Sequence, residues 1–562
     1  MITHRSPISG ISAHNNRYVA TAGYDNVLIL WDAETKRSIA RGCHDHLVNQ
    51  CVFNGDGKYL ASTSSDYTTR VWKIPSMQIQ SILTGHTDDT EGISFHPTKE
   101  LIATSSRDAT IKIFNYNGQL IKNLKGHELD VNSVEWMKNK DVLISSSDDG
   151  TVKFWDYESG EVIRDLSFDE VDTDTIAVSG DGTIFAGNYE GEIVIISEER
   201  EPINVNAHKA GIKSLEYSEK QQKLISCSYD RSFKIWNYKD GMLHLEANHQ
   251  FDNMVWPRSC AFLNDSEVVF GTFGNKYAQF NLKTKQWADN NIECTYGYNA
   301  VWESNGDIYT IGDAGYTFKN GHKIAEVGSL CNFIIDFKGN IITGGQTGEI
   351  FNAETGEVYY QHSNPLNCAV NFKSNGEDAL AIGTYNGEAV VLTIDKNGSV
   401  QYENTYKFHE NAIKGIAASE ESIFTVCAAG VAAYHDVNTF KSQKVITDGH
   451  DKIANGAVAI GNGNFASTGR DLKLRIWEDG KVKVVDTSHK NSIKCISSDS
   501  ESLIALGDYV GFVSVYDMKK DAFVAHMRVS DFGISSMTYD TTRKLFIASC
   551  YDGKAYDIEL SK

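Results

Sequence analysis

The apolar and polar positions of residues 126–156 form three short alternating runs, over 131–136, 142–146 and 152–154. An alternation of period two is typical of strands that bury one face. Asn-Lys-Asp and Asp-Asp-Gly segments separate the runs and supply the residue types that turns prefer. The segment therefore predicts antiparallel strands, and it opens on a Gly-His pair and closes on a Trp-Asp pair.

A histidine recurs along the chain at steps of about 40 residues, once two longer gaps are divided into two and three steps. These histidines are His4, His44, His86, His127, His208, His249, His362, His409, His450 and His489. Segments 183–196, 307–318 and 340–351 keep the texture of the second hairpin without the histidine, and residues 537–558 add a last copy. The sequence therefore predicts fourteen copies of one unit.

A Gly-His start and a Trp-Asp end at this separation resemble the WD repeat, the four-stranded blade of a β-propeller. Propellers typically have four to eight blades, so fourteen repeats divide into seven and seven. The resemblance implies an all-β fold of two seven-bladed WD-type β-propellers in tandem, with four-stranded antiparallel blades. We expect the N-terminal propeller at residues 1–289 and the C-terminal propeller at 290–562. The architecture is similar to that of two-propeller (fourteen-repeat) actin-interacting WD-repeat proteins, although no actin-specific motif is present.

The last repeat lacks a fourth run, while Met1-Ile2-Thr3 stands directly before His4, where an outer strand would end. Unpaired sheet edges invite pairing, and propellers of this kind commonly close by mixing strands from both termini. We therefore expect residues 1–3 to close the last blade of the second propeller.

The net charge of −21 and pI near 5.3 argue against a nucleic-acid partner, because phosphate binding requires clustered Lys and Arg. No apolar run approaches 18 residues and MITHRSPISG lacks the apolar core of a signal peptide. The ten cysteines contain no CxxC pair and lie mostly within strand-like runs, which is typical of a reducing cytosol. We expect a cytoplasmic monomer with protein or peptide partners and no membrane contact.

His127, Asp149 and Trp155, with Ser145 or Ser147, could be taken for a catalytic triad. The WD resemblance implies instead a structural network, in which the turn aspartate accepts from the histidine and a strand hydroxyl links the histidine to the indole. Strand alternation places both serines on one face, so the sequence does not choose between them. The same set recurs at His44, Asp66 and Trp72 and at His208, Asp230 and Trp236. Catalytic triads do not recur in this way.

No phosphate-binding GxxxxGK[ST], HExxH, GxSxG, zinc-ligand spacing or EF-hand order is present. We therefore expect no catalytic residue, no metal site and no cofactor.

The WD resemblance implies that the residue just before the turn aspartate faces the top of the ring and contacts ligands. These fourteen residues are Tyr24, Ser65, Arg107, Asp148, Tyr189, Tyr229, Phe273, Asp313, Gln346, Tyr385, Ala429, Arg470, Tyr509 and Tyr551. Half of them are aromatic, and Tyr and Arg are enriched at protein interfaces. The alternative is that the rings pack against neighbouring blades around a narrow channel.

The second candidate is Trp256-Pro257-Arg258, in a stretch about four residues longer than the repeat before the first strand of its blade. A Trp and an Arg on a long loop form a plausible contact surface. Alternatively, Trp256 fills a wider blade. The candidate partner-binding residues are Tyr24, Arg107, Tyr189, Tyr229, Trp256, Arg258, Phe273, Tyr385, Arg470, Tyr509 and Tyr551.

We expect a non-enzymatic interaction scaffold or adaptor that binds partner proteins on the top faces of the propellers. Two alternatives remain open. One is an actin-type cytoskeletal regulator, and the other is an enzyme, which would require carboxylates or a metal in a charged central channel.

Overall fold

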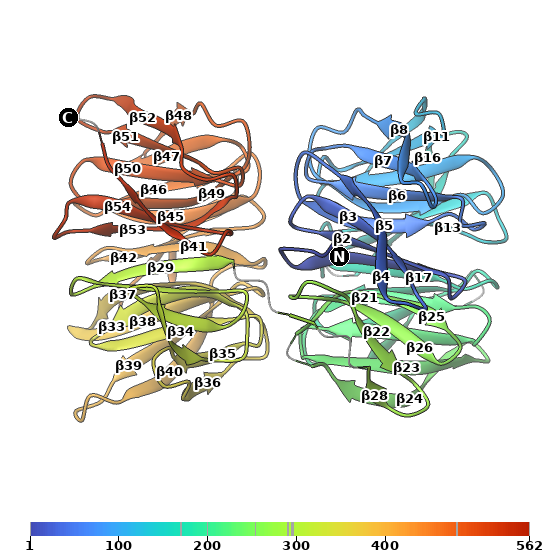
Figure 1. Ribbon diagram of the computed structural model, residues 1–562, viewed down its shortest axis with the longest axis horizontal. Coiled ribbons are helices and arrows are strands. Elements are labelled where there is room, and N and C mark those ends of the chain that lie inside the picture. The colour runs from blue at the N-terminus through green and yellow to red at the C-terminus, as the bar shows by residue number, and fades with distance from the viewer. Residues whose placement is uncertain are drawn as a thin grey trace. The chain divides into compact units, whose positions relative to one another are not determined.

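The computed structural model describes residues 2–168, 171–198, 200–252, 254–288, 292–293, 297–478 and 481–560. All regular elements in these ranges are strands, which divide between two compact units, Met1–Thr295 and Tyr296–Lys562 (Figure 1). The expected boundary at 289/290 lies outside the described residues, between the last strand of the first unit and the first strand of the second. No helix in the described ranges is long and apolar enough to cross a bilayer.

The first unit contains seven four-stranded antiparallel sheets, numbered here 1 to 7, and each takes its strands in chain order. Their strands are β1 (Ile8–His14), β2 (Tyr18–Gly23), β3 (Val27–Asp32), β4 (Arg37–Cys43); β5 (Val48–Phe53), β6 (Tyr59–Ser64), β7 (Thr69–Lys73), β8 (Gln78–Leu83); β9 (Thr90–Phe95), β10 (Leu101–Ser106), β11 (Thr110–Asn115), β12 (Leu120–Lys125); β13 (Val131–Trp136), β14 (Val142–Ser147), β15 (Thr151–Asp156), β16 (Glu161–Ser167); β17 (Thr173–Val178), β18 (Ile184–Asn188), β19 (Glu192–Ile196), β20 (Ile203–Asn206); β21 (Ile212–Ser218), β22 (Lys223–Ser228), β23 (Ser232–Lys239), β24 (Met242–Gln250); and β25 (Val255–Asn264), β26 (Glu267–Thr272), β27 (Ala278–Asn281), β28 (Gln286–Trp287).

The second unit contains sheets 8 to 14, of which the last has three strands among the described residues. Their strands are β29 (Tyr298–Ser304), β30 (Asp307–Gly312), β31 (Tyr316–Lys319), β32 (His322–Glu326); β33 (Cys331–Phe337), β34 (Asn340–Gly345), β35 (Glu349–Asn352), β36 (Val358–Gln361); β37 (Leu366–Ser374), β38 (Glu377–Thr384), β39 (Glu388–Ile394), β40 (Val400–Lys407); β41 (Ile413–Ala418), β42 (Ser422–Cys427), β43 (Ala432–Asp436), β44 (Ser442–Ile446); β45 (Ala454–Gly461), β46 (Asn464–Gly469), β47 (Lys473–Glu478), β48 (Lys481–Asp486); β49 (Ile493–Ser498), β50 (Leu503–Asp508), β51 (Phe512–Asp517), β52 (Ala522–Arg528); and β53 (Ile534–Asp540), β54 (Leu545–Cys550), β55 (Ala555–Ile558).

Each unit closes into a ring through the first strands of its sheets. Each of these inner strands contacts the inner strand of the next sheet, and β25 returns to β1 in the first unit as β53 returns to β29 in the second. The predicted fold, two seven-bladed β-propellers in tandem, is therefore confirmed. The core lies in apolar layers between adjacent sheets, such as the layer in which Leu60 and Trp72 of sheet 2 pack on Ala20 and Leu30 of sheet 1.

The expected closure of the second ring by residues 1–3 is wrong for the residues described. The backbone amide of Ile2 donates to the Ser38 hydroxyl over 3.0 Å, and the amide of His4 donates to the Asn275 carbonyl over 3.0 Å. The side chain of Ile2 packs on the apolar layer that contains Trp31 of sheet 1 and Val269 of sheet 7. An apolar side chain gains more from this layer than from an exposed edge. Met1 lies outside the described residues.

Two details of the repeat also differ from expectation. His249 lies within the outer strand β24, so it does not occupy the loop that carries the other repeat histidines. The extra residues around Trp256 do not precede the first strand of their sheet. They form a wide bulge inside β25, between Val255 and Cys260, which pair with Thr272 and Phe270.

Candidate functional site

One backbone hydrogen bond recurs in all fourteen sheets and positions the predicted turn residues. The amide of the turn residue between the second and third strands donates to the carbonyl of the residue before the first strand, as from Tyr24 to Pro7 and from Tyr551 to Gly533. The donors are Tyr24, Ser65, Arg107, Asp148, Tyr189, Tyr229, Phe273, Asp313, Gln346, Tyr385, Ala428, Arg470, Tyr509 and Tyr551. In sheet 11 the position belongs to Ala428, so the expected Ala429 is wrong by one residue.

A β-bulge at the start of every inner strand supplies a second residue beside each turn. In several sheets this residue is an asparagine whose amide donates to the inner strand of the next sheet. The bonds from Asn332 to Leu366, from Asn367 to Ile413 and from Asn455 to Ile493 are each 2.7 Å long. These amides join neighbouring sheets at one end of the channel.

We call that end of each ring its mouth. A mouth comprises three residues from each sheet: the residue before the inner strand, the bulge residue at its start and the turn residue. In sheet 7 the longer bulge contributes residues 256–259 in place of a single residue.

The first mouth is dense in paired charges. It contains three cations, Arg107, Lys213 and Arg258, and six carboxylates, Asp89, Glu91, Asp130, Asp148, Asp172 and Asp174. Arg107 donates to Glu91 over 2.6 Å and to Asp130 over 2.7 Å. Lys213 forms an ion pair with Asp174, and Arg258 forms one with Glu91 at 3.4 Å. Every cation of the first mouth therefore has a carboxylate partner.

Burial raises the pKa of two of these carboxylates, whereas nearby cations lower the pKa of a third. Burial raises the pKa of Asp130 against the effect of Arg107, and burial also raises the pKa of Asp148 against its hydrogen bond from Asn132. For Glu91 the charges of Arg107 and Arg258 outweigh burial and hold the pKa below its ordinary value. No group of three or more His, Cys, Asp or Glu side chains in the described ranges has an arrangement that could hold a metal ion.

The bulge in β25 carries two side chains that contact other sheets at the first mouth. Trp256 packs edge-on against Tyr24 at a centroid distance of 5.3 Å, and its ring lies 5.4 Å from that of Phe273 at a tilt of 31°. Arg258 lies 5.7 Å from the Trp256 ring and reaches Glu91, which belongs to sheet 3 rather than to an adjacent sheet. The extra residues of sheet 7 therefore bridge the mouth from one side to the other.

Three of the predicted partner-binding residues are buried in this packing. Trp256 is 6% exposed, Tyr229 is 7% exposed and Phe273 is 4% exposed. Lys213 lies 4.5 Å from the ring of Tyr189 and 5.4 Å from that of Tyr229, and it donates to the Tyr189 hydroxyl. These positions agree with the packing alternative for Trp256, Tyr229 and Phe273, whereas Tyr24, Arg107, Tyr189 and Arg258 keep partial exposure.

The second mouth has a different composition. It holds three cations, Lys414, Arg470 and Lys494, and one carboxylate, Asp313. Lys414 lies 4.3 Å from the centroid of the Tyr385 ring. Tyr509 and Tyr551 are nearly parallel, at 10° and a centroid distance of 6.3 Å. The predicted residues Tyr385, Arg470, Tyr509 and Tyr551 are all partly exposed here.

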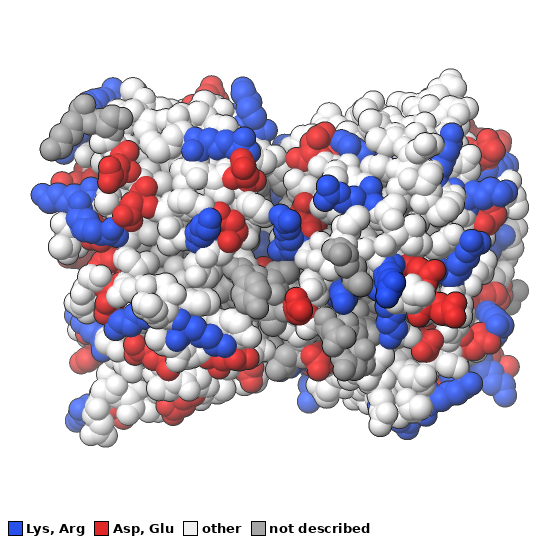
Figure 2. Space-filling view, in the orientation of Figure 1, with Lys and Arg blue, Asp and Glu red and all other residues white. Residues whose placement is uncertain are grey.

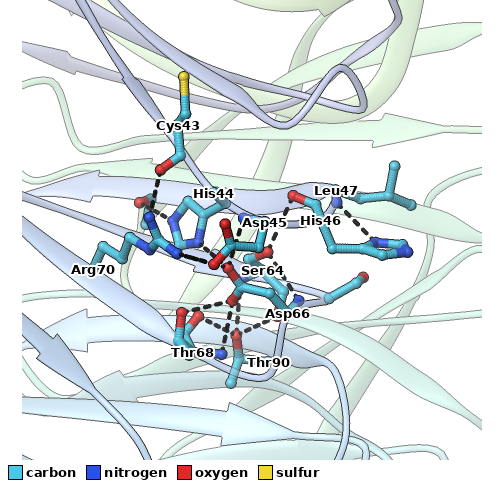
Figure 3. Close-up of polar contacts among 12 residues, drawn as sticks. Cys43, His44, Asp45, His46, Leu47, Ser64, Asp66, Thr68, Arg70 and Thr90 are labelled. Carbon is cyan, nitrogen blue, oxygen red and sulfur yellow. Dashed lines mark hydrogen bonds and ion pairs between the residues drawn. The ribbon is translucent and has the colours of Figure 1, made fainter. Parts of the chain in front are cut away.

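The predicted structural network has the geometry of a fixed support. In sheet 2, His44 bonds Asp66 at 3.0 Å and Ser62 at 2.8 Å, while the Trp72 indole donates to the same hydroxyl. Figure 3 shows His44 directed at Asp66, which also accepts from Thr68 and Arg70. Burial alone would raise the pKa of Asp66, but its bond to His44 holds the pKa well below the ordinary value.

The other two predicted sets of this network have the same geometry. The bonds are His127 to Asp149 at 2.7 Å and Trp155 to Ser145 at 2.8 Å, with His208 to Asp230 at 3.0 Å and Trp236 to Ser226 at 2.9 Å. Of the two serines left open by the sequence, Ser145 therefore links the histidine and the indole.

Sequence reasoning missed the bulge residues Glu91, Lys213, Lys414 and Lys494. Each is the second residue of an inner strand, and the repeat alignment could have identified that position. Sequence reasoning also missed the histidine network of sheet 13. There His489 bonds Asp508 on the second strand at 2.8 Å and Ser514 on the third strand at 2.7 Å. No sequence signal identifies this change of partner in advance.

Comparisons with known proteins match parts of the chain. A family model described as "WD domain, G-beta repeat" matches residues 1–32 and 37–73. A second model, "Anaphase-promoting complex subunit 4 WD40 domain", matches residues 93–220.

Similar curated proteins include "Target of rapamycin complex subunit wat1" of Schizosaccharomyces pombe, 27% identical over 243 residues, or 41% of this chain and 76% of that one. "Nuclear distribution protein nudF" of Emericella nidulans is 27% identical over 20% of this chain and 30% of its own. "Protein HIR1" of Yarrowia lipolytica is 26% identical over 21% and 13%. The chain thus spans less than a third of nudF and HIR1. The solved "Structure of U3-55K" is 18% identical, with a TM-score of 0.44, over 49% of this chain and 90% of that one.

Proposed function

This chain is a WD-repeat β-propeller protein, and from that premise we propose that it is a non-enzymatic scaffold that holds partner proteins at its ring mouths. One observation carries the proposal: in each ring the turn and bulge residues of seven sheets gather at one end. Tyr and Arg side chains remain partly exposed there, and these types dominate interface energetics. The proposed contact residues are Tyr24, Arg107, Tyr189, Arg258, Tyr385, Arg470, Tyr509 and Tyr551.

The relatives support the general class of function. The wat1 protein is named as a subunit of a complex, which is a role in protein association. A rigid ring with residues from several sheets at one mouth suits the same role, since binding to a preorganised surface costs little ordering.

The first mouth meets one condition for an enzyme, because carboxylates converge in it. We propose that these carboxylates are structural rather than catalytic, since they pair with the cations of the mouth. Turnover of a small molecule by the purified chain, lost in Asp130→Asn, would contradict this part of the proposal.

Affinity purification with the intact chain tests the scaffold. Tyr385→Ala and Tyr551→Ala change the second mouth, whereas Tyr402→Ala changes an exposed outer strand of the same sheet as Tyr385. We expect at least one protein, confirmed by binding of the two purified components, to be lost with the mouth variants and kept with Tyr402→Ala. Capture of the same proteins by all three variants, at unchanged thermal stability, would contradict the proposal.

We further propose that the scaffold is a cytoplasmic monomer without a nucleic-acid or membrane partner. The nine cysteines that the structure describes are free thiols, and Figure 2 shows acidic and basic side chains interspersed over the face in view. Analytical ultracentrifugation would reveal a dimer. The alternative of an actin-regulatory protein is supported by the presence of two seven-sheet rings. Co-sedimentation of the chain with actin filaments would support this alternative further.

A further inference from the structure

The outer strands of several sheets carry one residue that the strand ladder does not pair. In sheet 3 the pairs between β11 and β12 leave Ile121 as an extra residue in a bulge, and in sheet 4 the pairs between β15 and β16 leave Ile163 in the same place. Ile121 is 43% exposed and Ile163 is 57% exposed. Neither side chain has a cross-strand partner that would require it to be apolar.

Sheets 3 and 4 differ from the other sheets at this position. The extra residue is polar in sheets 2, 6, 10 and 11, where it is Gln80, Glu246, Glu403 and Gln443. It is apolar and exposed in sheets 1, 8 and 13, which are neighbours neither of one another nor of sheets 3 and 4. Among the described residues, only sheets 3 and 4 are neighbours that both expose a large apolar side chain in this place.

The outer strands β12 and β16 lie side by side at the rim of the first ring. A Cβ at Gly126, which follows β12, would lie 3.5 Å from Cγ2 of Val162 in β16. A Cβ at Gly160, just before β16, would lie 3.5 Å from Cδ of Lys122 in β12. Leu120 and Val162, which are 45% and 37% exposed, extend the apolar surface along the two strands. We call this surface the rim patch, and its residues are Leu120, Ile121, Val162 and Ile163.

Cations border the rim patch. Lys122 follows Ile121 directly, and Lys125 ends β12 beside the glycine that β16 approaches. Neither lysine forms an ion pair within the described part of the chain, and β12 contains no carboxylate. The strand β16 carries Glu161 and Asp165, and Asp165 pairs with a lysine of β15. The rim patch therefore has an excess of positive charge at its margin.

We propose that the rim patch binds an amphipathic helix of a partner protein, whose apolar face covers Ile121 and Ile163 and whose carboxylates pair with Lys122 and Lys125. The rim patch is separate from the ring mouths, so it adds a second contact surface to the proposed scaffold. The two isoleucines belong to strands of different sheets. A helix with apolar residues three and four positions apart can span both strands, whereas an extended segment would add to the edge of one strand.

The charge of the surroundings favours an acidic helix over a lipid surface. A bilayer of anionic lipids would meet a chain whose net charge is −21, whereas a helix contacts the rim patch alone. Attraction between exposed charges is confined to about 8–10 Å at physiological salt, so the lysines beside the patch determine which helix is preferred. Burial of apolar side chains supplies most of the affinity, because exposed ion pairs contribute little.

Fluorescence anisotropy with the full-length chain tests the proposal. The probes are three labelled eighteen-residue peptides with a helical pattern. The first has leucine on one face and glutamate on the other, the second has lysine in place of glutamate, and the third has serine in place of leucine. We expect the peptide of leucine and glutamate to bind most tightly.

Variants of the chain locate the binding surface. Ile121→Ser and Ile163→Ser should each weaken binding of the leucine–glutamate peptide about fivefold to tenfold. Lys122→Gln should weaken it about twofold to threefold, and high salt should remove this difference. Leu245→Ser is the matched control, because it removes a leucine that is 52% exposed on the outer strand β24 of sheet 6, and it should leave binding unchanged.

Four results would overturn the inference: no binding of the leucine–glutamate peptide, equal or tighter binding of the lysine peptide, equal affinity of Ile163→Ser and the unchanged chain, or sedimentation of the chain with phosphatidylserine vesicles without binding of the peptide. The last result would assign the patch to a lipid surface. Tyr385→Ala and Tyr551→Ala should bind the peptide as the unchanged chain does, so the rim patch and the ring mouths are tested separately. The comparison of peptides uses the unchanged chain, so it holds even if a variant folds poorly.

Discussion

Arg258 of sheet 7 lies 3.4 Å from Glu91 of sheet 3, so an ion pair joins two sheets that are not neighbours in the ring. Glu91 also accepts from Arg107 over 2.6 Å. The carboxylate of Glu91 is thus the point at which two cations of the first mouth meet. The wide bulge of β25 makes this contact possible, because it carries Arg258 away from the strand ladder.

Replacing Glu91 by Gln should therefore destabilise the first ring. The change leaves two partly buried guanidinium groups without their common counter-charge, which costs on the order of 2–3 kcal/mol. The charges of Arg107 and Arg258 hold the pKa of Glu91 below its ordinary value, so its contribution is present at neutral pH and is lost as pH falls through the folded-state pKa. Differential scanning calorimetry at pH 7 checks the loss. The exposed Glu100→Gln provides the charge-matched control, and an equal melt for both variants would show that Glu91 is not the meeting point.

In sheet 11 the residue before the repeat histidine is larger than in sheet 4, and the residue at the tryptophan position is smaller. In sheet 4, Gly126 lies against the Trp155 ring, and a Cβ at this position would be 3.1 Å from the ring, which is a tight contact. In sheet 11 the equivalent pair is Phe408 and His435, whose rings stack at 3.8 Å. His435 bonds Thr425 at 2.9 Å, where other sheets use an indole.

His435→Trp alone should clash with Phe408 and cost about 1–3 kcal/mol, whereas Phe408→Gly combined with His435→Trp should recover most of this. The recovered pair would copy the bond from Trp477 to Ser467 in sheet 12, which is 2.8 Å long. Chemical denaturation of the single and double variants forms a double-mutant cycle. Additive losses would mean that the two rings do not share one space.

The repeat period made the ring count predictable, because every sheet repeats the same alternation and the same turn. The turn residues were predictable for the same reason, to within one residue in sheet 11. The bulge residues were not predicted from the sequence. Strand alternation assigns each side chain to one face of the sheet, and a bulge breaks that rule. The position of Ile2 was also missed: an unpaired edge suggested a partner, while the apolar layer beside Trp31 decided the outcome.

The histidines of sheet 11 should make the second ring sensitive to acid. Burial lowers the pKa of His435 to about 3 and that of His409 to about 4. In the unfolded chain histidine binds a proton near pH 6.5, so the unfolded state gains protons first and stability falls from pH 6.5 down towards pH 4. At pH 5 the loss attributable to His435 is on the order of 1–2 kcal/mol.

Melting temperatures at pH 7 and pH 5 check this expectation. Phe408→Gly combined with His435→Trp removes one titrating group and keeps all others, so it should lose less stability than the unchanged chain over this interval. Parallel losses in both proteins would assign the acid sensitivity to other residues.

Two carboxylates on the inner strands β13 and β21 should make the first ring less stable as pH rises, the opposite of the effect expected from the histidines of sheet 11. Burial, followed by the charge of Glu135, raises the pKa of Glu216 to about 8, and burial raises that of Glu135 to about 7 although Ser94 donates to it over 2.7 Å. The folded chain therefore retains protons that the unfolded chain releases near pH 4.5, and stability falls as pH rises from 4.5 towards 8. Glu216→Gln imitates the protonated form, so it should stabilise the first ring by on the order of 1–3 kcal/mol at pH 8 and by much less at pH 5. Thermal unfolding at both pH values, with the exposed Glu201→Gln as control, measures the difference. A loss of stability at pH 8 would show that the Glu216 carboxylate is ionised and held by groups that glutamine cannot replace.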